Sequence, residues 1–217
     1  YEYGSTPSTP SINANGSGGT VTVYYSAYSD IVTNPAHRLE WKDITGTTLN
    51  VGTYYMIAHV AGTHNFTEGT TDLITFQVTR SSYAAPIAPT VSDFTVTIGE
   101  ADREKDLEYA VVTQGSDAPT GYVPVPALNS SGSFDLTGLA ESTNYTIYLR
   151  QKASADGNYA ASDPVSANFT TPYSVAYNAN YGSGTVPASV TQNSGSSVIV
   201  DSGSGLWRTG YTFNGWN

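Results

Sequence analysis

The stretch Leu139-Ala140-Glu141-Ser142-Thr143-Asn144-Tyr145 decides the fold that we expect for this chain. Its Leu-x-x-x-Thr-x-Tyr frame recurs at Leu49-Asn50-Val51-Gly52-Thr53-Tyr54-Tyr55, and a strand-like segment follows each copy. A tyrosine at the bend between two strands can bond its hydroxyl to backbone a few residues upstream, which is the tyrosine corner of β-sandwiches. The frame therefore predicts two related sandwiches, with tyrosine corners at Tyr55 and Tyr145.

Short apolar or alternating segments surround the second copy of the frame at regular intervals. They are Phe94–Ile98, Leu107–Val112, Tyr122–Val125, Ser133–Leu136, Tyr145–Arg150 and Val165–Phe169. Alternation with a period of two indicates half-buried strands, and many short strands separated by turn residues are typical of a sandwich. Similar segments surround the first copy. We therefore expect a mainly β chain.

Two proline-marked joints divide the chain. The first is Tyr83-Ala84-Ala85-Pro86-Ile87-Ala88-Pro89-Thr90, and the second is Thr170-Thr171-Pro172-Tyr173. Proline lacks the amide donor that a sheet needs and stiffens the backbone, so each joint is expected to be a short, semi-rigid linker. The sequence thus predicts three units at 1–84, 85–171 and 172–217, which are two sandwiches followed by a smaller β unit.

Composition argues against several classes of partner. The formal net charge of −10 repels the phosphate backbone of nucleic acids and anionic membrane surfaces, and the eight Lys and Arg residues are scattered. The absence of Cys rules out disulfides and thiolate chemistry. No apolar run approaches the roughly 20 residues that span a bilayer. We therefore expect no nucleic-acid partner and no membrane insertion of this segment.

The first two units resemble known families. Leu139 to Tyr145, continued by Tyr148-Leu149-Arg150-Gln151-Lys152-Ala153, resembles the Leu-x-Pro-x-Thr-x-Tyr signature of fibronectin type III domains, with Glu141 in place of the proline. In the first unit, Gly19-Thr20-Val21-Thr22-Val23-Tyr24-Tyr25-Ser26 resembles part of a bacterial Ig-like repeat. These resemblances imply an Ig-like sandwich followed by a fibronectin type III-like sandwich, modules found together in large bacterial surface proteins.

The third unit carries the most specific resemblance. Val175-Ala176-Tyr177-Asn178-Ala179-Asn180-Tyr181-Gly182-Ser183-Gly184-Thr185-Val186-Pro187 and Arg208-Thr209-Gly210-Tyr211-Thr212-Phe213-Asn214-Gly215-Trp216 resemble the Listeria–Bacteroides repeat, also called the internalin-type B repeat. Tyr181 stands where the family usually has glycine. The resemblance implies a compact β-grasp-like fold in a surface-anchored protein. Family modules continue with another turn and a closing strand, so this copy reads as truncated. We expect the native protein to continue past Asn217, or another chain to cover this edge.

The densest run of charge is Glu100-Ala101-Asp102-Arg103-Glu104-Lys105-Asp106-Leu107-Glu108. Acids at alternate positions would share one face of an extended strand, which makes Asp102, Glu104 and Asp106 candidate Ca²⁺ ligands. The run lacks the glycine turn that wraps a cation, and its two basic residues dilute the negative charge. A solvated segment is therefore the favoured interpretation. We assign the chain no metal and no cofactor.

Aromatic side chains are the other candidates for ligand contact, because sugars stack on exposed rings. Tyr24, Tyr28 and Trp41 belong to an aromatic-rich part of the first unit. Neighbours on a strand point to opposite faces of the sheet, so one ring of each adjacent tyrosine pair is expected to be exposed. Packing on the sheet is the favoured interpretation, and a contact patch for a glycan or host protein is the alternative.

The sequence contains no Gly-x-Ser-x-Gly elbow, no His-Glu-x-x-His pair and no phosphate-binding glycine loop. We therefore expect a non-enzymatic array of extracellular modules from a bacterial surface protein, attached through regions outside this chain and acting as a stalk or spacer. Two alternatives stay open. One is an adhesin segment that binds glycans or surface proteins through exposed aromatics or sheet edges. The other is the accessory region of a secreted polysaccharide-degrading enzyme. Neighbouring modules and further copies of this chain are additional candidate partners.

Overall fold

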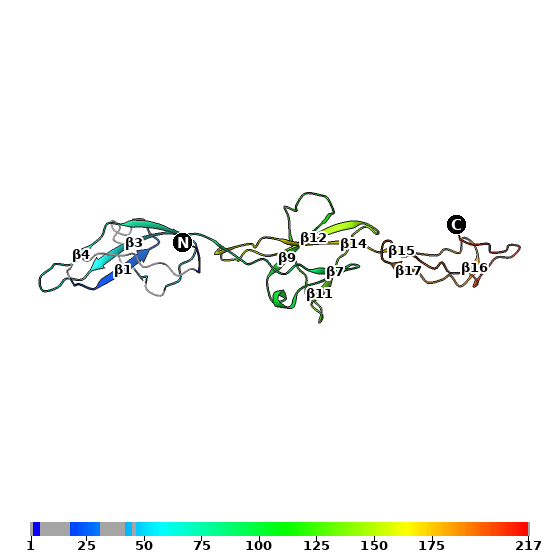
Figure 1. Ribbon diagram of the computed structural model, residues 1–217, viewed down its shortest axis with the longest axis horizontal. Helices are drawn as coiled ribbons and strands as arrows, with labels where there is room; N and C mark the ends of the chain where they lie inside the picture. The colour runs from blue at the N-terminus through cyan, green and yellow to red at the C-terminus, as the bar shows by residue number, and fades with distance from the viewer. Residues whose placement is uncertain (1, 5–17, 31–41, 45–46, 217) are drawn as a thin grey trace. The chain divides into compact units, whose positions relative to one another are not determined.

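The computed structural model describes residues 2–4, 18–30, 42–44 and 47–216 of the chain. Nearly all of its regular structure is β (Figure 1), which confirms the mainly-β expectation. The one helical element among the described residues is the short 3-10 helix η1, Glu100–Asp102. No helix in this part of the chain is long and apolar enough to cross a membrane. Contacts group the chain into two compact units, Tyr1–Tyr83 with Ala153–Ala161, and Ala84–Lys152 with Ser162–Asn217.

The first unit is organised around one antiparallel sheet. Its long central strand β3, Gly52–Val60, pairs with β1, Val21–Ser26, along one edge. The strands β4, Gly69–Thr70, and β5, Ile74–Val78, pair with β3, and β2, Lys42–Asp43, pairs with β1. The sheet is rich in β-branched and aromatic residues, which suit a pleated surface. Among the described residues of this unit, the buried apolar side chains are Val23, Leu49, Ala58 and Val78.

The segment Ala153–Ala161 packs with the first unit although it lies far along the chain. Its strand β13, Tyr159–Ala160, pairs in parallel with β6, Ser81–Ser82. The buried Asn158 accepts a hydrogen bond from Val51 N at 2.7 Å and donates through Nδ2 to Asn50 Oδ1 at 2.9 Å. The proline-marked boundaries assign residues 153–161 to the second predicted unit and do not account for their pairing with β6. These boundaries stay a prediction from the sequence.

The second unit contains a sandwich of two antiparallel sheets, seen in green and yellow-green in Figure 1. One sheet has the order β10-β9-β12-β14 and the other β11-β8-β7. The first sheet consists of β10, Val123–Pro124, β9, Leu107–Thr113, β12, Asn144–Gln151, and β14, Val165–Thr170. The second consists of β11, Ser133–Asp135, β8, Thr95–Thr97, and β7, Thr90–Ser92. Every strand of the sandwich except β7 overlaps a segment that the sequence pattern predicted, and β7 begins at the last residue of the first proline-marked joint.

The sandwich has a continuous apolar core. Val96, Ile98, Ile147 and Leu149 are completely buried, and they come from or lie next to β8 and β12, one in each sheet. Leu107, Phe134, Leu136 and Phe169 complete the buried cluster. Alternating inward residues of two facing sheets fill such a core. The apolar positions of the alternating sequence segments are therefore the side chains that pack between the sheets.

Residues 172–216 form two short antiparallel pairs. The strand β15, Tyr173–Val175, pairs with β17, Val190–Gln192, and β16, Ser183–Gly184, pairs with β18, Leu206–Trp207. Gly184 has a φ of +108°, and a Cβ there would lie 2.0 Å from the Gly205 carbonyl oxygen, so only glycine fits this pairing. The β-grasp likeness of this segment stays an expectation from the resemblance.

Candidate binding pocket

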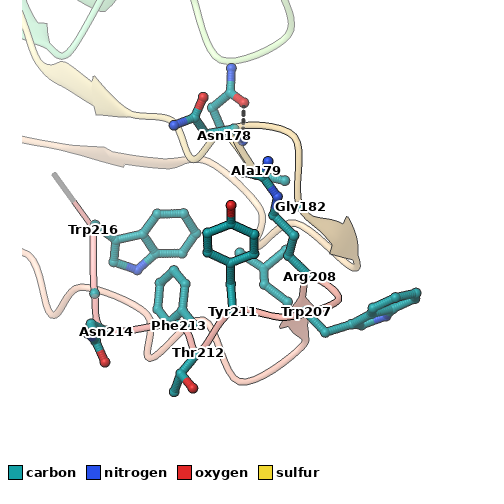
Figure 2. Close-up of a pocket in the computed structure, with 13 residues that line it drawn as sticks. Asn178, Ala179, Gly182, Trp207, Arg208, Tyr211, Thr212, Phe213, Asn214 and Trp216 are labelled. Carbon is teal, nitrogen blue, oxygen red and sulfur yellow. Dashed lines mark hydrogen bonds between the residues drawn. The ribbon is translucent and has the colours of Figure 1, made fainter.

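A cavity of about 220 Å³ opens in the C-terminal part of the chain (Figure 2). Strands β16 and β18 and the turns around them bring its walls together. The lining combines aromatic rings, one guanidinium group and several side-chain amides. Its residues are Asn178, Ala179, Asn180, Gly182, Leu206, Trp207, Arg208, Tyr211, Thr212, Phe213, Asn214, Gly215 and Trp216.

One wall of the pocket consists of aromatic rings that pack against one another. The Trp216 ring lies 4.7 Å from that of Tyr177 and 5.1 Å from that of Phe213, measured between centroids. Trp216 Nε1 donates to the Asp201 carbonyl oxygen at 2.7 Å, and the Tyr177 hydroxyl accepts from Asp201 N at 3.0 Å. Two hydrogen bonds to one backbone residue fix both rings. This wall therefore has a defined position before any ligand arrives.

The opposite side of the pocket is open. The Arg208 guanidinium lies over the Tyr211 ring, 4.4 Å from its centroid, and Tyr211 N donates to the Arg208 carbonyl oxygen at 3.0 Å. Tyr211 is 69% exposed and Trp207 is 63% exposed. In Figure 2 the Tyr211 ring stands between Phe213 and Trp216 on one side and Arg208 and Trp207 on the other. A cation held over a ring gains roughly 0.5–1 kcal/mol at an exposed site, which favours this arrangement of the two side chains.

Hydrogen-bonding groups border the aromatic surface. Asn178 Oδ1 accepts from Asn180 N at 2.8 Å, the dashed line in Figure 2, which orients the amide and leaves its Nδ2 as a donor. Within the described part of the chain, the structure gives neither the Arg208 guanidinium nor the Tyr211 hydroxyl a hydrogen-bonding or ion-pairing partner, apart from the contact between them. The pocket thus offers apolar ring faces beside polar groups that a ligand can engage.

The three aromatic residues predicted as ligand contacts in the first unit lie in different surroundings. Tyr24 is half-buried in β1, opposite Ile57 of β3. Tyr28 follows that strand and is 43% exposed, and Trp41 lies outside the described residues. A patch made by these three rings therefore stays a prediction.

The three candidate metal ligands have separate surroundings. Asp102 is buried, and its Oδ2 accepts from Ile87 N at 2.7 Å while its Oδ1 accepts from Lys105 Nζ at 2.6 Å. Burial opposes ionisation of this carboxyl, but the hydrogen bonds from Lys105 and the Ile87 amide outweigh it and lower the Asp102 pKa. Glu104 is exposed, and Asp106 is exposed with Lys152 Nζ 3.7 Å from its Oδ2. Among the described residues, no three acidic, histidine or cysteine side chains gather into a group that could hold a metal ion.

The two tyrosine frames differ in detail. Tyr145 Oη accepts from Ala140 N at 3.0 Å, which is the bond to upstream backbone that defines a tyrosine corner. In the first unit it is the Tyr54 hydroxyl that donates upstream, to the Asn50 carbonyl oxygen at 3.0 Å, whereas the frame had pointed to Tyr55. Adjacent strand residues face opposite sides of a sheet, so the hydroxyl that reaches the bend is set by the local register, which the frame does not specify.

Sequence reasoning missed the pocket at residues 178–216 as a binding site. The motif Gly210-Tyr211-Thr212-Phe213-Asn214-Gly215-Trp216 was interpreted as a feature of the fold, although its rings supply most of the aromatic lining. The signal was present, because three aromatics and one arginine fall within nine residues, but the sequence did not show which rings would be exposed. No protein-family model matches the chain, and no curated protein matches it.

Proposed function

We propose that this chain is a non-enzymatic segment of an extracellular bacterial surface protein and acts as a spacer. The observation that carries the proposal is the joint between the sandwich and residues 172–216. Strand β14 ends at Thr170 and β15 begins at Tyr173, so two residues separate them. Both of these residues, Thr171 and Pro172, are fully buried. A joint of this kind contains no freely rotating linker.

Thr171 binds the joint to the loop that precedes β12. Its Oγ1 donates to the Ala140 carbonyl oxygen at 2.6 Å and accepts from Thr143 N at 2.9 Å. Its backbone N donates to the Thr143 carbonyl oxygen at 3.0 Å. The net value of one such bond is about 0.5–1.5 kcal/mol, and leaving a buried partner unpaired costs more. Several bonds made by one residue therefore oppose bending at this point.

Glu141 connects the loop before β12 to strand β15, on the C-terminal side of the joint. Its carboxylate accepts from Ser174 Oγ at 2.7 Å and from Ser174 N at 3.3 Å. Ser142 N donates to the Pro172 carbonyl oxygen at 3.2 Å. Glu141 is the residue that replaces the usual proline of the fibronectin type III signature. The departure from the signature thus supplies a contact that supports a spacer.

Support for the extracellular bacterial location comes from the resemblances of the three sequence units. The full open reading frame tests this part of the proposal. A long array of repeats with a surface-anchoring signal is the expected finding. A catalytic domain next to this segment would contradict the spacer function and favour an accessory role in an enzyme.

Spin labels test the rigidity of the joint directly. The chain has no Cys, so Asp117→Cys and Ala188→Cys, both at exposed positions, would carry the only two labels. We expect a narrow distance distribution by double electron–electron resonance, which broadens when Glu141→Ala and Thr171→Val are added. The control pair Asp117→Cys and Asp163→Cys lies within the sandwich and should stay narrow throughout. A distribution that is broad before the joint is altered would overturn the spacer proposal.

A further inference from the structure

We propose that the pocket at residues 178–216 binds a single pyranose ring of a carbohydrate. This goes beyond the spacer function, because a spacer needs no ligand. Four independent properties of the pocket lead to this ligand: its size, its exposed rings, its hydrogen-bonding groups and its charge.

The size of the pocket sets the size of its ligand. Sites for small molecules usually measure roughly 300–1,000 Å³. A cavity of about 220 Å³ is smaller, so the part of a ligand that enters it is about the size of one ring. An end residue or a protruding residue of a glycan would meet this limit, with the rest of the glycan outside.

The exposed rings give the pocket its apolar contact surface. Tyr211 leaves most of its area in water and stands beside Phe213, and exposed large aromatics often mark contact sites. Trp207 is exposed as well, but its ring points away from the other rings in Figure 2. The faces of pyranose rings carry axial C–H groups, which pack on the negative face of an aromatic ring. Phe213 and Trp216 continue this surface into the fixed wall. A flat, partly apolar ring is the matching ligand shape.

The polar groups around the rings match neighbouring hydroxyls. Arg208 presents planar donors, and the Asn178 amide is already oriented by its bond from Asn180 N. Arg208 is held over Tyr211, so little side-chain freedom is lost when it bonds a ligand. Planar groups with two donors or acceptors fit pairs of adjacent hydroxyls, which sugars have and apolar or proline-rich ligands lack.

Charge separates a carbohydrate from anionic polymers. Asp201 and Arg208 are the two charged side chains in residues 172–217, so this part of the chain is formally neutral. The chain as a whole carries a net charge of −10, which disfavours nucleic acids and other polyphosphates. The Arg208 guanidinium, which has no ion-pair partner among the residues that the structure describes, suits a neutral sugar or one carboxylate of a hexuronate.

Titration of the full chain with methyl glycosides of a hexose, an N-acetylhexosamine and a hexuronate tests the proposal. The readout is the three tryptophan indole N–H signals in NMR spectra. We expect at least one glycoside, at millimolar concentration, to shift the Trp207 signal in a saturable way. Tyr211→Ala should weaken that binding by about tenfold or more, as the loss of a central aromatic contact commonly does.

Matched variants keep the result interpretable. Tyr181→Ala removes a tyrosine that is 90% exposed in the same part of the chain but does not line the pocket, and it should leave binding unchanged. Tyr211→Phe should retain most of the affinity, and an unshifted Trp216 indole signal shows that the fixed wall is intact. Absence of any glycoside-dependent shift would overturn the proposal. So would equal loss of binding in Tyr181→Ala and Tyr211→Ala, or a proline-rich peptide that shifts the Trp207 signal when no glycoside does.

Discussion

The sandwich and the C-terminal residues 172–216 use the same kinds of side chain in opposite ways. In the sandwich, Ile147 and Leu149 of β12 are completely buried, and so are Val96 and Ile98 from the facing sheet. In the C-terminal part, Ile199 is 96% exposed and Tyr181 is 90% exposed. Both parts are rich in β-branched and aromatic residues. Composition alone therefore does not decide whether such residues form a core or a surface.

The difference follows from the number and length of the strands. Two facing sheets of four and three strands cover each other's inner faces, which removes their apolar side chains from water. Two isolated pairs of two or three residues per strand have no facing layer of comparable size. Stability is thus concentrated in the sandwich, and accessible aromatic chemistry is concentrated in the C-terminal part.

Removal of a core side chain should have the largest effect. Ile147→Ala leaves a cavity between the two sheets and is expected to destabilise the sandwich by about 2–5 kcal/mol, measured by urea denaturation. Val123→Ala, at an exposed position of the same sheet, is the control and should cost much less. Equal, small effects of both changes would show that the sandwich is not held by this core.

Loss of the Asp102 charge should come next. Asp102→Asn weakens the bonds to Lys105 and the Ile87 amide and is expected to cost about 1.5–3 kcal/mol at neutral pH, the usual value for hydrogen bonds to charged groups. The folded-state pKa of Asp102 lies below its ordinary value of 3.8. Its stabilising contribution is therefore present above that value and is lost as the pH falls through the folded-state pKa.

Denaturation curves at a series of acidic pH values check this linkage. The difference in stability between the unaltered protein and Asp102→Asn should shrink as the pH falls below 3.8. A difference that is independent of pH would mean that the ionised carboxylate does not provide the stabilisation.

A backbone change in the C-terminal part should have a smaller and local effect. Gly203 is buried with a φ of +68°, and a Cβ there would lie 2.4 Å from Phe213 Cε1. Gly203→Ala should strain the turn by roughly 1–3 kcal/mol and displace the Phe213 ring from the pocket wall. The Trp216 indole signal should shift while the sandwich keeps its urea midpoint. A lowered sandwich midpoint would contradict the separation between the two parts.

The tyrosine hydroxyls should show the smallest effects. Tyr145→Phe removes the acceptor for Ala140 N, and Tyr54→Phe removes the donor to the Asn50 carbonyl oxygen. Each is expected to cost about 1 kcal/mol by urea denaturation. A cost for Tyr55→Phe that exceeds that for Tyr54→Phe would show that the original frame, rather than the observed bond, identifies the corner of the first unit.

Local patterning made the strands of the sandwich predictable. The alternation at 94–98 and the apolar run at 107–112 correspond to β8 and β9, because each pairs with a neighbouring strand of similar length in its own sheet. The pairing of β13 with β6 was not predictable, because it joins short segments that are nearly eighty residues apart and have no periodic signal. Long-range hydrogen bonds such as those of Asn158 leave no mark in local sequence.

The candidate site was less predictable than the fold. The rings of the first unit were proposed as ligand contacts because aromatic residues are dense in that part of the sequence. The pocket depends instead on which aromatic side chains are exposed, and on the folding that brings Asn178, Tyr211 and Trp216 into one lining. The acidic run was separated by folding, since Asp102 turned inward to bind Ile87 N and Lys105 while Glu104 stayed exposed. Residue type identified the available chemistry, and tertiary structure decided where it is used.

Amide hydrogen exchange on the full chain tests most directly whether stability and accessible chemistry are divided between these two parts. Local opening free energies range from near zero in poorly packed segments to the global value in core strands. We expect the amides of β9, β12 and β14 to exchange slowest, and those of residues 176–216 to exchange far faster under the same conditions. Equal protection of the two parts would contradict the account, because it would place a cooperative core where the structure has an open aromatic surface.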